Sequence, residues 1–83
     1  MKQISYTKAA IRALRRMPAN TAMLIRSKIE AYAQDPGSQA NNVKSLKGRE
    51  GIRLRVAEWR VIMDEQGNVL AVLEIGPRGG IYD

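Results

Sequence analysis

The chain has 83 residues, enough for one domain and too few for two, so we expect a single domain over residues 1–83. It contains no cysteine and no histidine, which excludes disulfides, thiolate metal sites and both cysteine nucleophiles and histidine acid–base catalysis. The formal net charge is +6, from 14 Lys and Arg against 8 Asp and Glu, which favours a polyanion or an acidic protein as partner. No metal and no small-molecule cofactor is expected.

The positive charge is unevenly distributed along the chain. Residues 1–35 carry a net charge of +5 and residues 44–63 a net charge of +4, whereas residues 64–83 carry −3. A basic surface that serves only solubility would also give a positive total, so the charge by itself does not decide between the two interpretations. No apolar run is long enough to span a bilayer, and residues 1–5 do not begin a signal peptide, so we expect no membrane contact and a cytoplasmic protein.

The first half of the chain predicts one strand and two helices. Lys2 to Tyr6 has the pattern of a short strand, and Thr7 is a suitable N-cap for a helix over Lys8 to Met17. Pro18 ends that helix, and Asn20 or Thr21 can cap the next one. The second helix should end before Asp35-Pro36-Gly37, and its apolar stripe is expected to consist of Leu24, Ile25, Ile29 and Tyr32.

The second half predicts three strands after a polar loop over residues 37–43. Ile52, Leu54 and Val56 alternate with Arg53 and Arg55, as in a half-buried strand. A strand over Trp59 to Asp64, a turn over residues 64–68 and an apolar, central strand over Val69 to Ile75 follow, and residues 76–80 are expected to form a loop. The order β-αα-βββ predicts an α+β fold in which a helical hairpin packs on one face of a small antiparallel sheet.

Basic residues of the predicted sheet could converge on one of its faces. Arg53 and Arg55 share a strand face, Arg60 lies in the next strand, and Arg78 lies in a glycine-rich loop four residues before Tyr82. Arginine binds phosphate through a planar, permanently charged fork, so such a group would stabilise a phosphorane-like transition state. Each residue also has a plain structural interpretation: a solvated strand face for Arg53 and Arg55, an ion pair for Arg60, a loop charge for Arg78 and a hydrophobic anchor for Tyr82.

The middle and end of the chain resemble the RelE/ParE toxin superfamily, and the order of elements agrees over essentially the whole length. The segments that carry the resemblance are Leu46-Lys47-Gly48, Ile52-Arg53-Leu54-Arg55-Val56, Glu58-Trp59-Arg60-Val61-Ile62 and Ile75-Gly76-Pro77-Arg78-Gly79-Gly80-Ile81-Tyr82. The resemblance to the RelE-like branch implies a ribosome-dependent endoribonuclease that cleaves mRNA in the A site by attack of the 2′-hydroxyl on the scissile phosphate. It also implies three partners, which are the ribosome, its mRNA and a cognate antitoxin protein that masks the basic surface.

The resemblance also implies roles for individual residues. Arg60 and Arg78 match the arginines that stabilise the scissile phosphate, Arg53 matches a lysine of the basic strand, and Tyr82 matches a tyrosine that stacks on a base and takes part in proton transfer. Arg55 is implied to bind RNA. Where one branch has a further lysine, two residues before Arg53, this chain has Gly51, and the nearest alternatives are Lys47 and Arg49. Arginine is a poor proton donor or acceptor, so the general base is not identified.

Two other functions are compatible with the same sequence. A ParE-like inhibitor of DNA gyrase would share the fold and need no nuclease chemistry. A catalytically impaired paralogue, which only binds an antitoxin or RNA, is compatible with Gly51 and with the arginine that replaces lysine at position 53.

Overall fold

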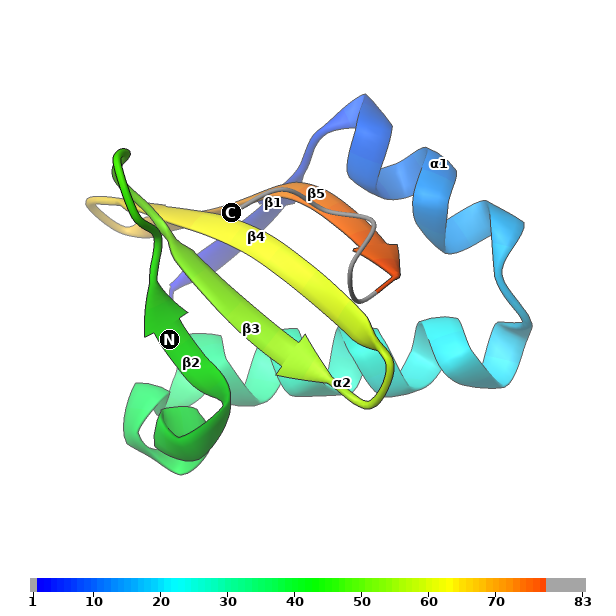
Figure 1. Ribbon diagram of the computed structural model, residues 1–83, viewed down its shortest axis with the longest axis horizontal. Coiled ribbons are helices and arrows are strands. Elements are labelled where there is room, and N and C mark those ends of the chain that lie inside the picture. Colours follow the sequence, from blue (N-terminus) through cyan, green and yellow to red (C-terminus); the bar gives the residue numbers. More distant parts are fainter. Residues whose placement is uncertain (1, 78–83) are drawn as a thin grey trace.

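A computed structural model of the chain describes residues 2–77. Helices and strands follow in the order β1-α1-α2-η1-β2-β3-β4-β5 (Figure 1). This order confirms the α+β class and the helical hairpin, and it adds a 3-10 segment and one strand to the predicted elements. The elements are β1 (Gln3–Tyr6), α1 (Lys8–Arg16), α2 (Ala19–Gln34), η1 (Pro36–Asn42), β2 (Val43–Ser45), β3 (Ile52–Val56), β4 (Trp59–Gln66) and β5 (Val69–Pro77).

The five strands form one sheet in the order β1-β5-β4-β3-β2. The pairs β3–β4 and β4–β5 are antiparallel, as predicted. The pair β2–β3 is antiparallel too, although strand β2 was not predicted. Strand β1 departs from the prediction, because it pairs with β5 in parallel, from Gln3 beside Val69 to Tyr6 beside Val72. Strand β5, expected to be central, is an interior strand between β1 and β4, and β4 occupies the middle of the sheet.

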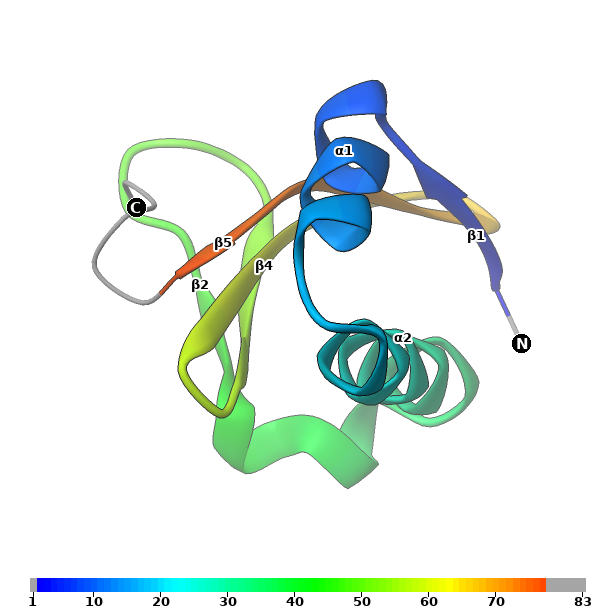
Figure 2. The same cartoon turned by 90° about the vertical axis from the view of Figure 1, so that its right-hand side faces the viewer.

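Both helices cover the same face of the sheet, and among residues 2–77 no helix covers the opposite face of β3 and β4 (Figure 2). The hydrophobic core lies between these layers. Leu24 does not belong to it: its side chain is 43% exposed, because it lies about 100° around the helix from the buried Ile25. The other members of the predicted stripe are buried, and the core includes Ala10, Leu14, Ile25, Ile29, Tyr32, Leu54, Val61, Met63, Leu70 and Val72.

The two helices begin in different ways. The Thr7 hydroxyl oxygen accepts a hydrogen bond from the Ala10 amide at 3.1 Å, which confirms the predicted N-cap of α1. The prediction of Asn20 or Thr21 as the cap of α2 is wrong, because the helix begins at Ala19 with Pro18 in the cap position. Proline at this point is already near helical φ and still offers its carbonyl, which accepts from the Ala22 amide at 3.0 Å.

The segment expected to be an irregular loop over residues 37–43 is more ordered than predicted. Its residues form the 3-10 segment η1, which leads directly into the short strand β2. Three residues are too few to show an alternating pattern, so sequence periodicity could not reveal this strand. Strand β2 extends the sheet beyond β3 and thereby adds side chains to both faces of the sheet.

A β-bulge interrupts the pairing of β4 with β5. Ile62 lies opposite Glu74, but the next residue, Met63, lies opposite Val72, so Leu73 is an extra residue in β5. An extra residue reverses the inward and outward alternation of the residues that follow it. As a result, β5 contributes Leu70 and Val72 to the core before the bulge and Ile75 after it, while Glu74 faces the open side beside Ile62.

Candidate nucleic-acid site

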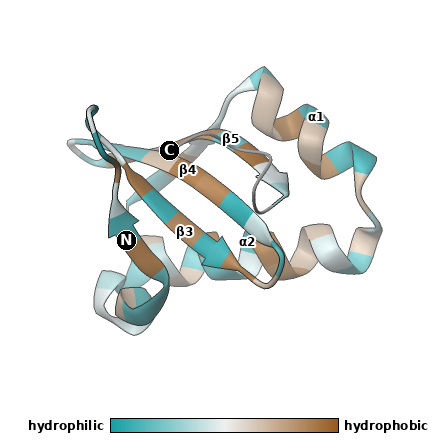
Figure 3. Cartoon of the chain, in the orientation of Figure 1, coloured by the Kyte–Doolittle hydropathy of each residue, from teal (hydrophilic) through white to brown (hydrophobic). Residues whose placement is uncertain are grey.

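Strands β3 and β4 bring three arginines onto the open face of the sheet. Arg55 and Arg60 are cross-strand partners, and Arg53 lies on the same face two residues before Arg55. The turn between the strands contains only Ala57 and Glu58, and Ala57 adopts a left-handed φ of 52° to close it. The alternation of polar and apolar residues along β3 is visible in Figure 3, and the apolar residues Leu54 and Val56 belong to the hydrophobic core.

Strand β2 and the segment η1 complete this group. Lys44 is the cross-strand partner of Arg53, so its side chain lies on the same open face. The surface is hollowed here, with a volume of about 250 Å³. We call it the basic hollow, and it is lined by Asn41, Asn42, Lys44, Arg53, Arg55 and Arg60.

Residues of like charge lie opposite each other across the strands of the basic hollow. Directly opposed residues of like charge destabilise an antiparallel pair, yet Lys44 opposes Arg53 and Arg55 opposes Arg60. Among residues 2–77, no carboxylate lines the hollow. Its two asparagines add neutral amide donors and acceptors to the four cations. This combination suits a ligand with phosphate groups and polar edges, such as a nucleic acid.

The predicted site residues are therefore only partly brought together. Arg53, Arg55 and Arg60 line the hollow. Lys47 and Arg49 are exposed in the connection between β2 and β3 and do not line it. The predictions for Arg78 and Tyr82 fall outside the described residues and stay predictions.

Three further residues of the hollow were missed by the sequence analysis. Lys44 lies on the undetected strand β2, and Asn41 and Asn42 end the 3-10 segment before it. The only local signal is the polar, basic character of the run from Gln39 to Lys44, which is equally typical of a surface loop. Their place in the hollow depends on the pairing of β2 with β3.

Gly51 has a backbone conformation that excludes a side chain. Its φ is +117°, and a Cβ atom built there would lie 2.9 Å from the Met63 carbonyl oxygen and 3.2 Å from Leu46 Cδ1. The Leu46 amide donates to the Gly51 carbonyl at 3.1 Å, which holds this end of the β2–β3 connection together. The fold thus requires glycine at the position where the resemblance implied a lysine in one branch of the family.

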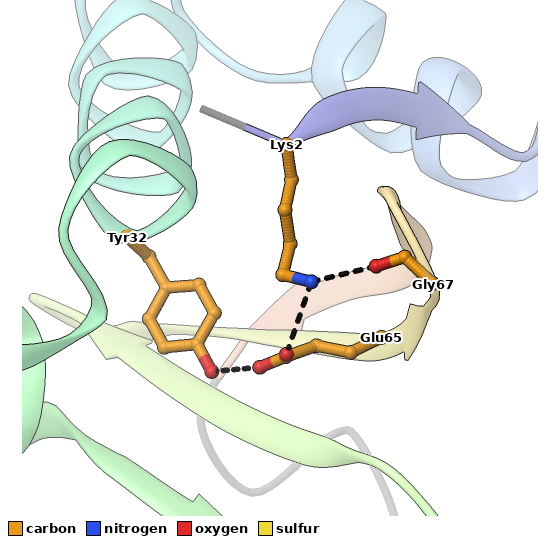
Figure 4. Close-up of polar contacts among 4 residues, drawn as sticks. All are labelled: Lys2, Tyr32, Glu65 and Gly67. Atoms are coloured by element: carbon orange, nitrogen blue, oxygen red, sulfur yellow. Dashed lines mark hydrogen bonds and ion pairs between the residues drawn. The ribbon is translucent and has the colours of Figure 1, made fainter.

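A second polar group lies at the opposite end of β4, on the side of the helices (Figure 4). The Tyr32 hydroxyl donates to Glu65 Oε1, and Lys2 Nζ lies 3.6 Å from Glu65 Oε2 and donates to the Gly67 carbonyl at 2.7 Å. Burial and the hydrogen bond to Glu65 raise the pKa of Tyr32 to about 12. These contacts join the residue before β1 to α2, to β4 and to the β4–β5 turn, so the group is structural.

Two properties of the described residues limit other kinds of site. Over residues 2–77, Asp and Glu side chains do not gather in threes where a metal ion could be held. Neither α1 nor α2 combines the length and the apolar character that crossing a membrane requires. Trp59 is half-buried and packs against the core.

No protein-family model matches the sequence, and no curated protein matches it. Solved structures do match the fold. A chain of the archaeal RelE–RelB complex from Pyrococcus horikoshii is 21% identical with a TM-score of 0.78, over 96% of this chain and 98% of that one. The RelB–RelE complex from Methanococcus jannaschii is 20% identical with a TM-score of 0.74, over 95% of each chain. The toxin-antitoxin complex RelBE of E. coli is 18% identical with a TM-score of 0.71, over 93% of this chain and 96% of that one.

Proposed function

The chain has the fold of RelE-type toxins, and we propose that it is the toxin of a type II toxin–antitoxin system that cleaves mRNA in the ribosomal A site. The 2′-oxygen attacks the adjacent phosphorus, the bond from phosphorus to the 5′-oxygen breaks, and the products are a cyclic phosphate and a 5′-hydroxyl. The observation that carries this proposal is that two cross-strand pairs of like charge, Lys44 with Arg53 and Arg55 with Arg60, line one hollow. An RNA phosphate placed between these two pairs would be within reach of cations from both.

The arginines of the basic hollow supply binding and charge stabilisation in this proposal. Arg60 and Arg53 hold the scissile phosphate, and their charge stabilises the additional negative charge of the transition state. Arg55 contacts the flanking backbone of the RNA. Arg78 and Tyr82 join them on the strength of the resemblance, as a phosphate ligand and a base-stacking residue. The chain has no histidine, and no carboxylate of residues 2–77 lines the hollow to activate the hydroxyl, so the ribosome positions the attacking group.

A cognate antitoxin is the proposed protein partner. The matching structures of Pyrococcus horikoshii, Methanococcus jannaschii and E. coli are complexes of RelE with RelB. An antitoxin with an acidic segment would be attracted by the net charge of +6 and would compete with RNA for the basic hollow. Binding only to the folded chain, it would also stabilise a domain of this small size.

The test is the mapping of mRNA 3′ ends after induction of the toxin, with and without translating ribosomes. We expect cleavage only with translating ribosomes, and we expect Arg60→Ala to lower it by at least about 100-fold, as loss of one transition-state contact does. Lys28→Ala on α2 removes the same charge from the helix-covered side and should leave cleavage unchanged. Thermal unfolding of each variant separates lost chemistry from lost folding.

Gyrase inhibition is the second candidate, because one matching structure, from Agrobacterium tumefaciens, is described as a YoeB/ParE toxin, at 20% identity and a TM-score of 0.73. A supercoiling assay with purified gyrase distinguishes the two functions. Inhibition of supercoiling without new mRNA ends would replace the nuclease proposal. Binding to RNA or to an antitoxin with neither effect would identify a catalytically impaired paralogue.

A further inference from the structure

The proposed cleavage needs a proton for the departing 5′-oxygen, and the described lining of the basic hollow offers one side chain suited to deliver it. Three of the four cations there are arginines, whose guanidinium groups do not give up a proton in proteins. The two asparagine amides do not ionise. Lys44 is the remaining cation, and an ammonium group, unlike a guanidinium group, can transfer one of its protons.

The sheet holds Lys44 in a defined position toward the phosphate-binding arginines. Its neighbours in β2 pair with core positions of β3, Val43 with Leu54 and Ser45 with Ile52, which directs Lys44 to the open face. Lys44 is separated from β4, the strand of Arg60, by two strand spacings, about 10 Å. A phosphate held above β3 therefore lies between two long side chains that approach it from opposite sides.

Because of the conformation of Gly51, position 51 cannot supply an amine to the hollow, and the amine comes from another strand. A side chain at position 51 would collide with the Met63 carbonyl and would require a φ that residues with a Cβ avoid. The first cation that β3 contributes to the hollow is therefore Arg53. It has the same charge as a lysine but does not transfer a proton. Lys44 lies directly across from Arg53 and places an amine beside it.

We propose that Lys44 is the general acid of the cleavage reaction, an inference that rests on the proposed nuclease function. As the 2′-oxygen forms its bond to phosphorus, the bond to the 5′-oxygen breaks, and that oxygen takes a proton from the Lys44 ammonium. The attacking hydroxyl releases its own proton to solvent, and the neutral Lys44 amine is reprotonated from solvent. Atoms and charge balance, and the products are the cyclic phosphate and the 5′-hydroxyl.

The test compares single-turnover cleavage of two mRNAs on ribosomes with a vacant A site, one ordinary and one with sulfur in place of the scissile 5′-oxygen. A thiolate leaves without protonation, so it needs no general acid. We expect Lys44→Ala and Lys44→Arg both to slow cleavage of the ordinary mRNA by about 100- to 10,000-fold. With the sulfur-containing mRNA, both deficits should shrink to less than about tenfold.

Lys44→Arg is the informative variant, because it keeps the positive charge and removes the transferable proton. Lys28→Ala is the matched control on the helix layer, and it should cleave both mRNAs at the rate of the unmodified protein. Equal deficits of Lys44→Arg on the two mRNAs, or full activity of this variant on the ordinary mRNA, would overturn the proposal while leaving the nuclease function intact. Failure of the unmodified protein to cleave either mRNA would overturn both.

Folding does not confuse this comparison. Lys44 is exposed and lies on the edge strand of the sheet, so neither variant removes a buried contact. Unfolding midpoints within a few degrees of the unmodified protein are expected for both, in line with ordinary surface substitutions. A cleavage deficit that follows the chemical identity of the leaving atom is then independent of protein stability.

Discussion

At the scale of single residues, Gly51 links the fold to the chemistry. Its φ of +117° and the close approach of the Met63 carbonyl exclude a side chain. The same conformation turns the chain into β3, which orients Arg53 and Arg55 to the open face. A structural requirement at one residue thus limits which residues can supply an amine to the basic hollow.

Gly51→Ala should lower the free energy of unfolding by about 3 kcal/mol, because the new Cβ adds steric overlap to an unfavourable φ. Gly48→Ala is the matched control: Gly48 also has a positive φ, +75°, but no atom lies within 4 Å of the Cβ position. We expect it to cost about 1 kcal/mol. Urea denaturation measures both, and equal losses would contradict the role of the Met63 contact.

Because of Tyr32, the free energy of unfolding depends on pH in the alkaline range. Burial and its hydrogen bond to Glu65 raise the pKa of this residue to about 12, from an ordinary value of 10.0. The folded state therefore favours the protonated phenol. The contribution is fully present below pH 10 and is lost as the pH rises from 10 through about 12, where the folded protein must also ionise.

Tyr32→Phe tests this contribution, since phenylalanine keeps the ring and removes the titrating hydroxyl. At pH 8 the variant should be less stable by about 1.5–3 kcal/mol, the usual contribution of a hydrogen bond to a charged group. Between pH 10 and pH 12 its disadvantage should shrink, as measured by chemical denaturation at each pH. A constant difference across this range would show that the hydroxyl does not titrate with the raised pKa.

At the scale of elements, Thr7 joins the start of α1 to the bulge in β5. Its hydroxyl accepts from the Ala10 amide at 3.1 Å and donates to the Leu73 carbonyl at 2.6 Å, while its own amide donates to the Val72 carbonyl at 3.0 Å. Leu73 is the extra residue of the bulge. The Thr7 side chain therefore caps a helix and also donates a hydrogen bond to the carbonyl of the bulged residue, which the irregular pairing of β4 with β5 leaves available.

Thr7→Ala should cost about 2 kcal/mol in the free energy of unfolding, because both hydroxyl hydrogen bonds are lost. Thr7→Ser keeps the hydroxyl and should recover most of this loss. Thr21→Ala is the control: Thr21 lies in the first turn of α2 but does not cap it, so a change within about 0.5 kcal/mol is expected. Thermal unfolding compares the three variants, and similar midpoints for all of them would contradict the double role.

At the scale of the whole molecule, the two faces of the sheet differ in what they carry. The covered face packs against both helices and carries the core, and the open face of β2, β3 and β4 carries the basic hollow. The short hairpin between β3 and β4 sets Arg55 opposite Arg60 by backbone pairing. The position of the charges, rather than the total of +6, should therefore decide how RNA binds.

The salt dependence of binding to single-stranded RNA measures this effect. Each contact between a cation and a phosphate contributes about 0.7 to the slope of the logarithm of affinity against the logarithm of salt concentration. Arg55→Ala should reduce the slope by about that amount, whereas Lys28→Ala should not change it, although each variant loses one charge. Equal slopes for these two variants would indicate binding to the overall charge.

The sequence by itself determined the features that depend on neighbours along the chain. The alternation in Ile52–Val56 predicted the arginine face of β3, Thr7 predicted the cap of α1, and the order of elements predicted the fold class. The tertiary structure decided what depends on pairing between distant segments: the parallel position of β1, the bulge at Leu73, and the entry of Asn41, Asn42 and Lys44 into the basic hollow. The physical reason is register. Hydrogen bonds between strands set which residues oppose one another, and a strand of three residues such as β2 is too short to show a sequence periodicity from which its pairing could be predicted.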